Sequence, residues 1–296
     1  MNFPSYPLDS SAYFNINNLR MHYLEGGKAN DETLVMIHGN PSWSFYYRNL
    51  FNSLVDKYHC IVPDHIGMGL SDKPDDNEYS FTLKERVDNL EALLDSLDAN
   101  KDLTLIVHDW GGMIGLAYAT RHPDRIRRLI ISNTAGFHIP AGKQVPWELK
   151  LTRTPFIGAL LNQGFNAFPK GAVSKCVTRK PMTKEISDAY IAPYDNWANR
   201  LSVLRFVEDI PLDKKHISYE VVDEVEKNLQ QFKSLPILIC WGLKDFVFDT
   251  DFLAEWKRRL PDAEYHEYDA GHYLLEDAGD EVIPVIQQFL EKNPVT

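Results

Sequence analysis

Asp109 stands at a position in the sequence where a side chain can act as a nucleophile. The apolar run 103–107 precedes it, and Gly111 and Gly112 follow closely. A buried strand, a sharp turn and a helix in this order form a nucleophile elbow, which presents one side chain above the end of the strand. The turn requires small neighbours. The two glycines meet this requirement, whereas Val107 replaces the glycine that is usual on the other side.

An aspartate at this position supports substitution chemistry at carbon. Its carboxylate can attack a saturated carbon or a strained ring and form an ester, which water then cleaves at the carbonyl carbon. A serine would instead form an ether, which is not readily hydrolysed. Asp109 could also be only the N-cap of the next helix, a common role for aspartate, but an ordinary cap does not need the preceding strand and two glycines.

A base and its carboxylate partner are expected at the ends of later strands, in the chain order nucleophile, acid, histidine. His272 lies in the loop after the last expected strand, whereas His266 lies within that strand. Asp245 comes just after the apolar run 237–241, where a carboxylate can hold the imidazole in the required tautomer. We therefore predict a triad of Asp109, His272 and Asp245.

Other residues could supply the acid of this triad. Asp249 and Asp251 lie close to Asp245 in the sequence, but they are better placed to start the next helix. The loop after the preceding strand is an alternative place for the acid, and it holds Asn133 and Thr134 without a carboxylate. Asp245 is therefore the preferred partner of His272.

Asn40 and Trp110 are expected to stabilise negative charge beside Asp109. Asn40 belongs to the run His38-Gly-Asn-Pro that follows an expected strand, and Trp110 follows the nucleophile. Their backbone N–H groups would form an oxyanion hole, in which each donor can be worth roughly 3–4 kcal/mol. The side-chain amide and the indole N–H are further donors for a halide, a carboxylate or another leaving anion. Packing or loop geometry alone would be the plain alternative for either residue.

Short β-rich runs alternate with helical patterns along the chain. The middle runs are apolar throughout, as in strands covered on both faces, and the first two, joined without a helix, predict an antiparallel edge. Expected strands cover residues 12–16, 19–24, 34–38, 60–63, 103–108, 129–133, 237–241 and 264–269, and expected helices cover 82–97, 112–121, 250–260 and 280–292. The alternation predicts an α/β protein with an eight-stranded, mostly parallel sheet and helices on both faces. Together with the nucleophile elbow it indicates the α/β-hydrolase fold.

One segment interrupts the alternation of strands and helices. The stretch from 136 to 215 is rich in aromatic residues and helical patterns and has no convincing buried strand. We predict an inserted helical cap over 136–215 and a core formed by residues 1–135 and 216–296. An aromatic and aliphatic cap suits a small apolar substrate, although such a cap also needs apolar residues for its own core.

Composition narrows the class of protein. The 296 residues carry a formal net charge of −11, and without a basic face nucleic acid is not an expected partner. The three cysteines, Cys60, Cys176 and Cys240, are too far apart for a disulfide framework or a zinc site, which fits a reducing cytoplasm. The N-terminus lacks the features of a signal peptide, and no apolar run is long enough for a transmembrane segment.

With these residues in place, the sequence resembles the haloalkane dehalogenases, in the branch that uses a second aspartate as the acid. Within that group it looks like the β-lactone decarboxylases of bacterial long-chain olefin biosynthesis, which act on cis-3-alkyl-4-alkyloxetan-2-ones. The likeness extends from residue 21 to the C-terminus and rests on the stretches HGNPSWSFYYR, CIVPDHIGMGLSDKPDD, VHDWGGMIG, AYIAPYDNWANRLSVLRFVEDIPL and HYLLED. The run 60–76 and the cap stretch 189–212 indicate the decarboxylases, whereas the other motifs are shared by the wider group.

The resemblance implies a role for each candidate residue. Asp109 would be the nucleophile, His272 the base and Asp245 its partner, and Asn40 with Trp110 would bind the leaving anion. The reaction would convert the lactone to a cis-alkene and carbon dioxide, with no cofactor or metal. Members of the family also work in an assembly with the lactone-forming synthetase and the reductase of the pathway, so these proteins are expected partners.

Three other functions fit parts of the pattern. A haloalkane dehalogenase would use the same triad to release alcohol and halide. An epoxide hydrolase also has an elbow aspartate followed by tryptophan, but it more often has an aromatic residue where Asn40 stands. It also needs two cap tyrosines, a pair for which Tyr190 and Tyr194 could be mistaken. A binding or scaffold protein on a retired enzyme fold would have a broken triad.

Overall fold

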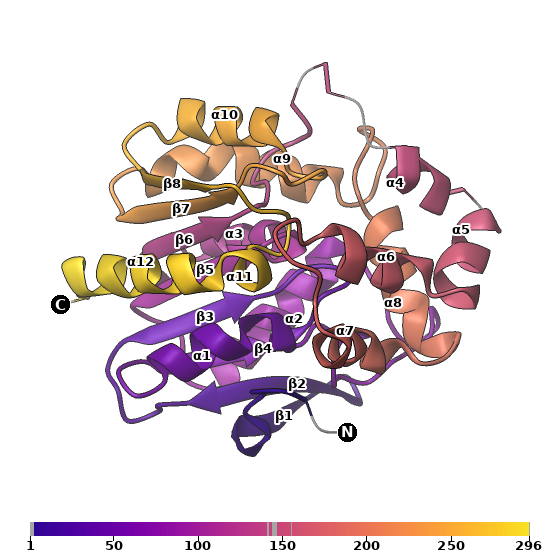
Figure 1. Cartoon of the computed structure of the whole chain (residues 1–296). Coiled ribbons are helices and arrows are strands. Elements are labelled where there is room, and N and C mark those ends of the chain that lie inside the picture. The colour runs from indigo at the N-terminus through magenta and orange to yellow at the C-terminus, as the bar shows by residue number, and fades with distance from the viewer. Residues whose placement is uncertain (1–2, 141, 144–146, 155, 296) are drawn as a thin grey trace.

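The computed structural model describes residues 3–140, 142–143, 147–154 and 156–295. Eight strands form one sheet in the order β1-β2-β4-β3-β5-β6-β7-β8 (Figure 1). They are β1 (Ser11–Ile16), β2 (Leu19–Gly26), β3 (Thr33–Ile37), β4 (His59–Pro63), β5 (Leu103–His108), β6 (Ile126–Ser132), β7 (Ile237–Gly242) and β8 (Glu264–Tyr268). The predicted sheet is confirmed, and each strand lies within a few residues of its expected bounds.

The sheet is parallel from β4 to β8, and its other edge is antiparallel. β1 pairs antiparallel with β2, as the short connection between them predicts, and β2 also pairs antiparallel with β4. The five strands β4, β3, β5, β6 and β7 are buried at almost every position. Their carboxyl ends therefore meet at one edge of the sheet, where ligands of open α/β sheets bind.

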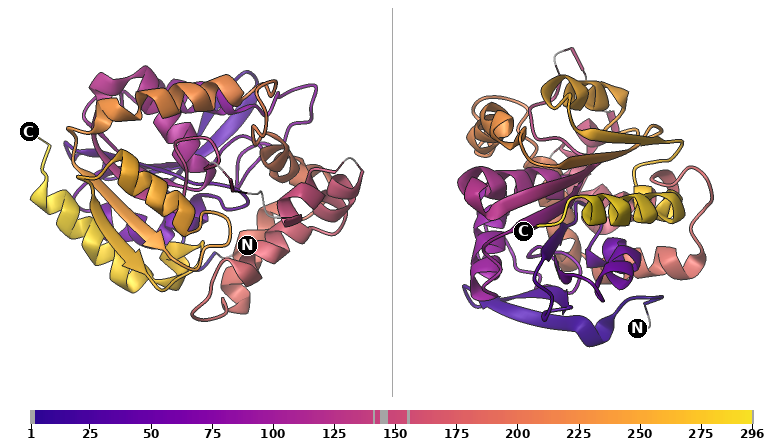
Figure 2. Two further views of the ribbon diagram at one scale, coloured as in Figure 1. Left: turned by 90° about the horizontal axis from the view of Figure 1, so that it is seen from above. Right: turned by 90° about the vertical axis from the view of Figure 1, so that its left-hand side faces the viewer.

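Helices cover both faces of the sheet (Figure 2). One face packs against α1 (Arg48–Leu54), α11 (Leu274–Asp277) and α12 (Gly279–Lys292). The other packs against α2 (Leu83–Ser96), α3 (Trp110–Arg121), α9 (Tyr219–Asn228) and α10 (Thr250–Arg259). The sequence patterns predict α2, α3, α10 and α12, whereas α1 and α9 were not among the expected helices.

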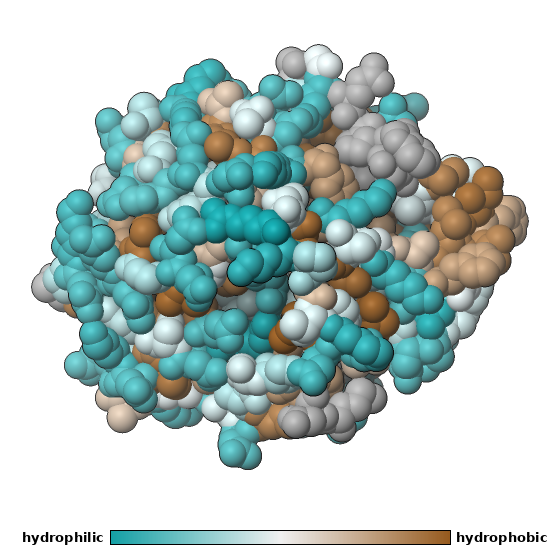
Figure 3. Space-filling model, viewed as in Figure 1, coloured by the Kyte–Doolittle hydropathy of each residue, from teal (hydrophilic) through white to brown (hydrophobic). Residues whose placement is uncertain are grey.

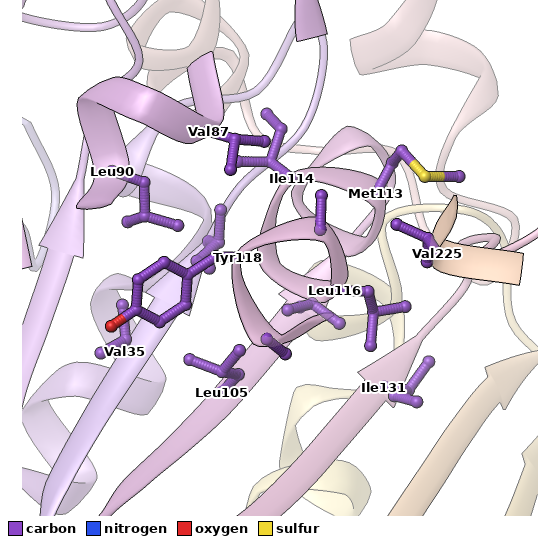
Figure 4. Close-up of a cluster of buried hydrophobic side chains, with 14 of the residues drawn as sticks. Val35, Val87, Leu90, Leu105, Met113, Ile114, Leu116, Tyr118, Ile131 and Val225 are labelled. Atoms are coloured by element: carbon purple, nitrogen blue, oxygen red, sulfur yellow. The ribbon is translucent and has the colours of Figure 1, made fainter. Parts of the chain in front are cut away.

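The helix that follows Asp109 is held from several sides. Figure 4 shows Ile114, Leu116 and Tyr118 of α3 among apolar side chains of the strands and of α2 and α9. α3 is apolar almost all round, and its residues from Gly111 to Ala119 are buried. A helix enclosed in this way provides a fixed support for the side chain at its N-terminal end.

Between β6 and β7, the described residues form helices and no strand. Apart from short 3-10 helices, the described elements before α9 are α4 (Trp147–Thr152), α5 (Ile157–Ala159), η4 (Leu160–Gly164), α6 (Ala167–Lys175), α7 (Lys184–Ile191) and α8 (Leu201–Glu208). In Figure 1 they lie at the right of the molecule, beside the carboxyl ends of the parallel strands. The division into a core of residues 1–135 and 216–296 and a cap of 136–215 stays a prediction. No described helix is both long and apolar enough to cross a bilayer.

Candidate active site

Asp109 lies at a sharp turn between β5 and α3. Its φ of 53° and ψ of −130° are unusual for a residue with a side chain, and such strain persists only where the surrounding structure imposes it. A Cβ at Gly111 would lie 1.9 Å from the carbonyl oxygen of Ile37, and one at Gly112 would lie 1.9 Å from Oγ1 of Thr134. Both glycines are therefore required by close contacts.

Val107, the departure from the usual elbow, is accommodated by a third glycine. Gly115 lies one turn further along α3, and a Cβ there would stand 2.8 Å from Cγ1 of Val107. The valine thus occupies space that a side chain on the helix would otherwise take.

The structure brings the three predicted triad residues together. Nδ1 of His272 lies 2.6 Å from Oδ2 of Asp245, and Nε2 lies 3.6 Å from Oδ2 of Asp109. All three side chains are buried. The imidazole therefore stands between two carboxylates, with one ring nitrogen fixed by Asp245 and the other directed at Asp109, which is the arrangement a base and its orienting acid require.

Burial and charge act in opposite directions on the two groups that would react. Burial alone lowers the pKa of His272, but the carboxylates of Asp245 and Asp109 outweigh it and raise that pKa above its usual value. Burial raises the pKa of Asp109, although His272 and the backbone N–H groups of Asn40 and Trp110 favour the ionised form. Carboxyl groups with a raised pKa occur often at active sites.

Two backbone donors hold the carboxylate of Asp109. The N–H of Asn40 donates to Oδ1 at 2.6 Å, and the N–H of Trp110 also bonds to this carboxyl group. The two predicted donors are therefore directed at the same group. A Cβ at Gly39 would lie only 2.0 Å from Oδ1 of Asp109, so the loop can approach the carboxylate only because residue 39 is glycine.

The side chains of the predicted anion-binding pair have different environments. Nδ2 of Asn40 donates to the carbonyl oxygen of Val203 in α8 at 3.1 Å, so one amide hydrogen is already used. The Trp110 ring packs edge-on against Phe206 at 5.3 Å between centroids. Both residues line the cavity above Asp109, where a leaving anion could meet the second amide hydrogen and the indole.

A cavity of about 360 Å³ opens above Asp109 and His272. Its walls are mostly apolar and come from both the sheet edge and the helices between β6 and β7. They include Met113, Phe137, Leu161, Phe168, Val207 and Phe252. An apolar cavity with a few polar groups at one end is typical of a small-molecule site. No group of three or more possible metal ligands occurs in the described part of the chain.

Asn133 supports the triad in a way the sequence reading did not anticipate. Its Nδ2 donates to Oδ2 of Asp245 at 3.0 Å and to the carbonyl oxygen of Gly242 at 3.1 Å, and its Oδ1 accepts from the Gly242 N–H at 2.8 Å. The residue therefore ties the end of β6 to the end of β7. The only sequence signal was its place directly after a buried strand.

The motif HYLLED fixes the loop that carries His272. Asp277 accepts from the Gly271 N–H at 2.7 Å and from the Thr178 N–H at 2.8 Å. Glu276 pairs with Arg48 in α1 and accepts from Tyr190 Oη at 2.6 Å. The two acidic residues thus hold the histidine loop against the core and against the helical segment.

The two tyrosines that an epoxide hydrolase would need do not face the cavity. Tyr190 bonds to Glu276, and Tyr194 directs its hydroxyl at the carbonyl oxygen of Ser42. Both are buried, and neither is among the described residues that line the cavity. The geometry therefore gives no support to epoxide opening by a tyrosine pair. The assembled triad likewise gives none to a binding or scaffold protein, for which the triad should be broken.

Comparisons with known proteins agree with this architecture. The family model described as alpha/beta hydrolase fold matches residues 32–279. The chain is 54% identical over 278 residues to a Shewanella oneidensis protein named cis-3-alkyl-4-alkyloxetan-2-one decarboxylase, covering 94% of this chain and 87% of that one. A protein of the same name from Xanthomonas campestris pv. campestris is 44% identical over 301 residues, which covers both chains completely.

A solved structure is similar over nearly the whole chain. The haloalkane dehalogenase DatA from Agrobacterium tumefaciens C58 superposes with a TM-score of 0.85 at 22% identity, covering 96% of this chain and 97% of that one. At this identity the likeness shows the fold alone. The fold class and the resemblance drawn from the sequence motifs are both confirmed.

Proposed function

Because this chain belongs to the α/β-hydrolase fold family, and within it to the group of its cis-3-alkyl-4-alkyloxetan-2-one decarboxylase relatives, we propose that it is a β-lactone decarboxylase. It would convert a cis-3-alkyl-4-alkyloxetan-2-one to a long-chain cis-alkene and carbon dioxide. The observation that carries the proposal is the Asp109 carboxylate, held by two backbone N–H groups at the polar end of an apolar cavity. The identity to the decarboxylases selects the lactone as substrate.

The reaction can be written without a cofactor and without water. Asp109 attacks C4 of the lactone ring, so that the bond from C4 to the ring oxygen breaks and a free carboxylate is released on C3. The bond from C3 to that carboxylate then breaks, and its electron pair forms the double bond as Asp109 leaves C4. Carbon dioxide departs and Asp109 is restored. Inversion at C4 followed by anti elimination converts a cis lactone to a cis-alkene.

The other site residues have distinct roles in this scheme. The side chains of Asn40 and Trp110 would bind the carboxylate released from the ring, as donors to a developing negative charge. His272, held by Asp245, would favour the ionised form of Asp109 before attack and again as it leaves. A base that activates water is needed only where the ester is hydrolysed.

Turnover of a synthetic cis-β-lactone tests the proposal. The purified chain should release cis-alkene and carbon dioxide, measured by gas chromatography with mass spectrometry. Asp109→Asn should abolish alkene formation, because the amide is a poor nucleophile. Unchanged turnover in Asp109→Asn would contradict covalent catalysis at this residue.

Haloalkane hydrolysis is the second candidate, since its triad and anion-binding pair would be the same. Parallel assays with a long-chain cis-β-lactone and a bromoalkane separate the two reactions. Fast bromide release with no alkene from the lactone would favour the dehalogenase.

We also propose the cellular setting that the family likeness implies. The protein would act in the cytoplasm, in olefin biosynthesis, in an assembly with the lactone-forming synthetase and the reductase of the pathway. The three free, buried cysteines are compatible with a reducing compartment. Co-purification of the tagged chain with those two enzymes from its own cells would support the assembly.

A further inference from the structure

Positive charge is concentrated in one segment of this acidic chain. Residues 140–184 include a single acidic residue, Glu148, and eight basic ones: Lys143, Lys150, Arg153, Lys170, Lys175, Arg179, Lys180 and Lys184. The whole chain has a net charge of −11, so the acidic residues lie elsewhere. Three of the basic residues pair with carboxylates: Lys143 with Asp249, Arg179 with Glu281 and Lys184 with Asp188. The remaining excess of basic residues creates a local field that attracts anionic surfaces.

The same segment carries an exposed apolar surface, which we call the apolar cap face. It consists of Phe156 and Ile157 around α5, Leu160 and Phe165 at the two ends of η4, and Trp197, whose ring lies against Gly164. These side chains are between 46% and 90% exposed. Figure 3 shows hydrophobic atoms gathered over α5, at the right-hand edge of the molecule. An exposed apolar surface of this kind usually marks an interaction site.

Basic helices adjoin this face. Exposed Lys150 lies on α4, which contacts α5, and exposed Lys170 lies on α6, which contacts η4. Tryptophan together with apolar side chains and flanking lysines is the composition of surfaces that enter the headgroup region of a bilayer. In a symmetric dimer through the same face, the lysines of the two copies would come together and repel.

Helices that form or adjoin the apolar cap face also line the cavity. Three residues are both exposed and part of the cavity wall: Leu151 of α4, Lys175 of α6 and Phe246. Of the elements that carry the face, η4 contributes Leu161 to the cavity wall. A ligand taken up at this face would therefore lie beside the helices that enclose Asp109.

We propose that the apolar cap face docks on an anionic lipid bilayer and takes up its substrate from it. The delivery step rests on the proposed function, because it assumes a lactone with two long alkyl chains, which partitions into lipid. The docking step does not rest on the proposed function. Phe156 and Leu160 would enter the headgroup region, and Lys150 and Lys170 would contact lipid phosphates.

Vesicle flotation tests the docking step without any substrate. The full chain should float with vesicles of phosphatidylcholine and phosphatidylglycerol, less with pure phosphatidylcholine, and less again at high salt. Lys150→Glu with Lys170→Glu should lower the partition coefficient by about 30-fold or more, from the usual worth of a basic residue near an anionic membrane. Phe156→Ser should lower it by about 10-fold or more.

The matched control changes two exposed lysines at the opposite end of the sheet. The control variant, Lys101→Glu with Lys233→Glu, changes the net charge by the same amount as the cap double variant. Both lysines lie just before the amino ends of strands, β5 and β7. This variant should leave vesicle binding almost unchanged. Absence of wild-type flotation would overturn the proposal, as would equal loss in the control. Loss of self-association in the cap variants, without vesicle binding in the wild type, would assign the face to a second copy instead.

Activity assays separate this proposal from the decarboxylase function. On a short-chain lactone dissolved in buffer, the cap variants should match the wild type. On a long-chain lactone embedded in anionic vesicles, they should be at least about 10-fold slower. Vesicle binding without any alkene would leave docking intact and remove the proposed function. Equal turnover of the embedded lactone by wild type and variants would remove the delivery step.

Discussion

At the scale of single residues, the site is organised around the buried carboxylate of Asp109, on whose pKa two effects act in opposite directions. Burial disfavours the charge of Asp109, while two backbone N–H groups and the imidazole of His272 favour it. The donors are fixed by the fold, so in the proposed reaction they need not reorganise when the carboxylate attacks and when it is restored. Asp109 would thus be anionic and still reach an apolar substrate.

Asp245→Asn should lower the pKa of His272. The Asp245 carboxylate is a main cause that raises this pKa against the effect of burial, so burial should dominate in the variant and move the pKa below its usual value. In the wild type, a raised histidine pKa adds stability below about pH 6.5 that is lost as the pH rises through the folded-state pKa. An NMR titration of the imidazole measures the shift.

Stability measurements at two pH values give a second view of the same variant. The loss of unfolding free energy in Asp245→Asn should be larger at pH 6 than at pH 9, because the imidazolium it stabilises is present only on the acid side. Urea unfolding provides both values. A loss that is independent of pH would mean that Asp245 acts only as a packing and hydrogen-bonding residue.

His272→Ala should separate the two candidate reactions. Hydrolysis of an Asp109 ester needs a base to activate water, so a bromoalkane should leave a stable alkyl group on the variant. Decarboxylation consumes no water, so alkene should still form, more slowly. Intact-protein mass spectrometry would detect the added alkyl mass with the bromoalkane and no adduct with the lactone. An ester that accumulates from the lactone would show that the departure of Asp109 from C4 depends on His272, and the two reactions would then not be separated by this variant.

Asn133→Ala should weaken both the fold and the site. The change leaves the buried N–H of Gly242 without its partner and removes one donor from Asp245. An unpaired buried polar group costs about 1–3 kcal/mol, and we expect that loss of unfolding free energy together with a lower kcat. Ser132→Ala, which removes a bond to the Val107 carbonyl, is the neighbouring control and should retain kcat.

At the scale of elements, most of the candidate site residues that the sequence could predict lie at the ends of strands. Buried parallel strands are continuous apolar runs, so their ends are visible, and the fold places functional residues there in a known order. Asp109, Asp245 and His272 were predicted in this way, and the structure brings their side chains together. The bond of Asn133 to Asp245 was not, because it joins residues 112 positions apart and depends on the register of two neighbouring strands.

The elements between β6 and β7 were harder to predict. Their aromatic residues serve the interior of the helical segment, the cavity wall or the surface, and hydrophobicity alone does not separate these uses. Tyr190 and Tyr194 were candidates for a catalytic pair, yet both hydroxyl groups are used in contacts with the core. Only the packing of the helices distinguishes such positions.

Gly39→Ala tests the contact between the oxyanion loop and the elbow. The new methyl group would meet Oδ1 of Asp109 at 2.0 Å, so the carboxylate or the loop must move by about an ångström. A displacement of that size can lower the rate by about 100-fold, while the fold should remain stable. Gly279→Ala, where a Cβ has no neighbour closer than 4.0 Å, is the control. Unchanged kcat in Gly39→Ala would show that the loop adapts freely.

At the scale of the whole molecule, buried polar contacts join the helical segment to the core. Trp43 donates from Nε1 to the carbonyl oxygen of Ala189. Arg86 of α2 lies over the ring of Phe206 in α8 and pairs with Asp209. The amide of Asn40 reaches α8 as well. Contacts of this kind fix the cavity wall relative to Asp109, so stability and site geometry are coupled.

The ion pair of Arg48 and Glu276 allows that coupling to be measured. The pair joins α1 to the helix that follows His272, and Tyr190 of α7 shares the carboxylate. Arg48→Met would leave Glu276 charged in a nearly buried position, which costs about 3–5 kcal/mol, and the shifted histidine loop should lower kcat. Arg48→Met with Glu276→Gln should recover most of the stability, since the amide still accepts from Tyr190 and no charge is left unpaired. Urea unfolding measures the loss of stability, and lactone turnover measures the loss of kcat. Equal stability of the single and double variants would contradict the view that the unpaired charge of Glu276 causes the loss of stability.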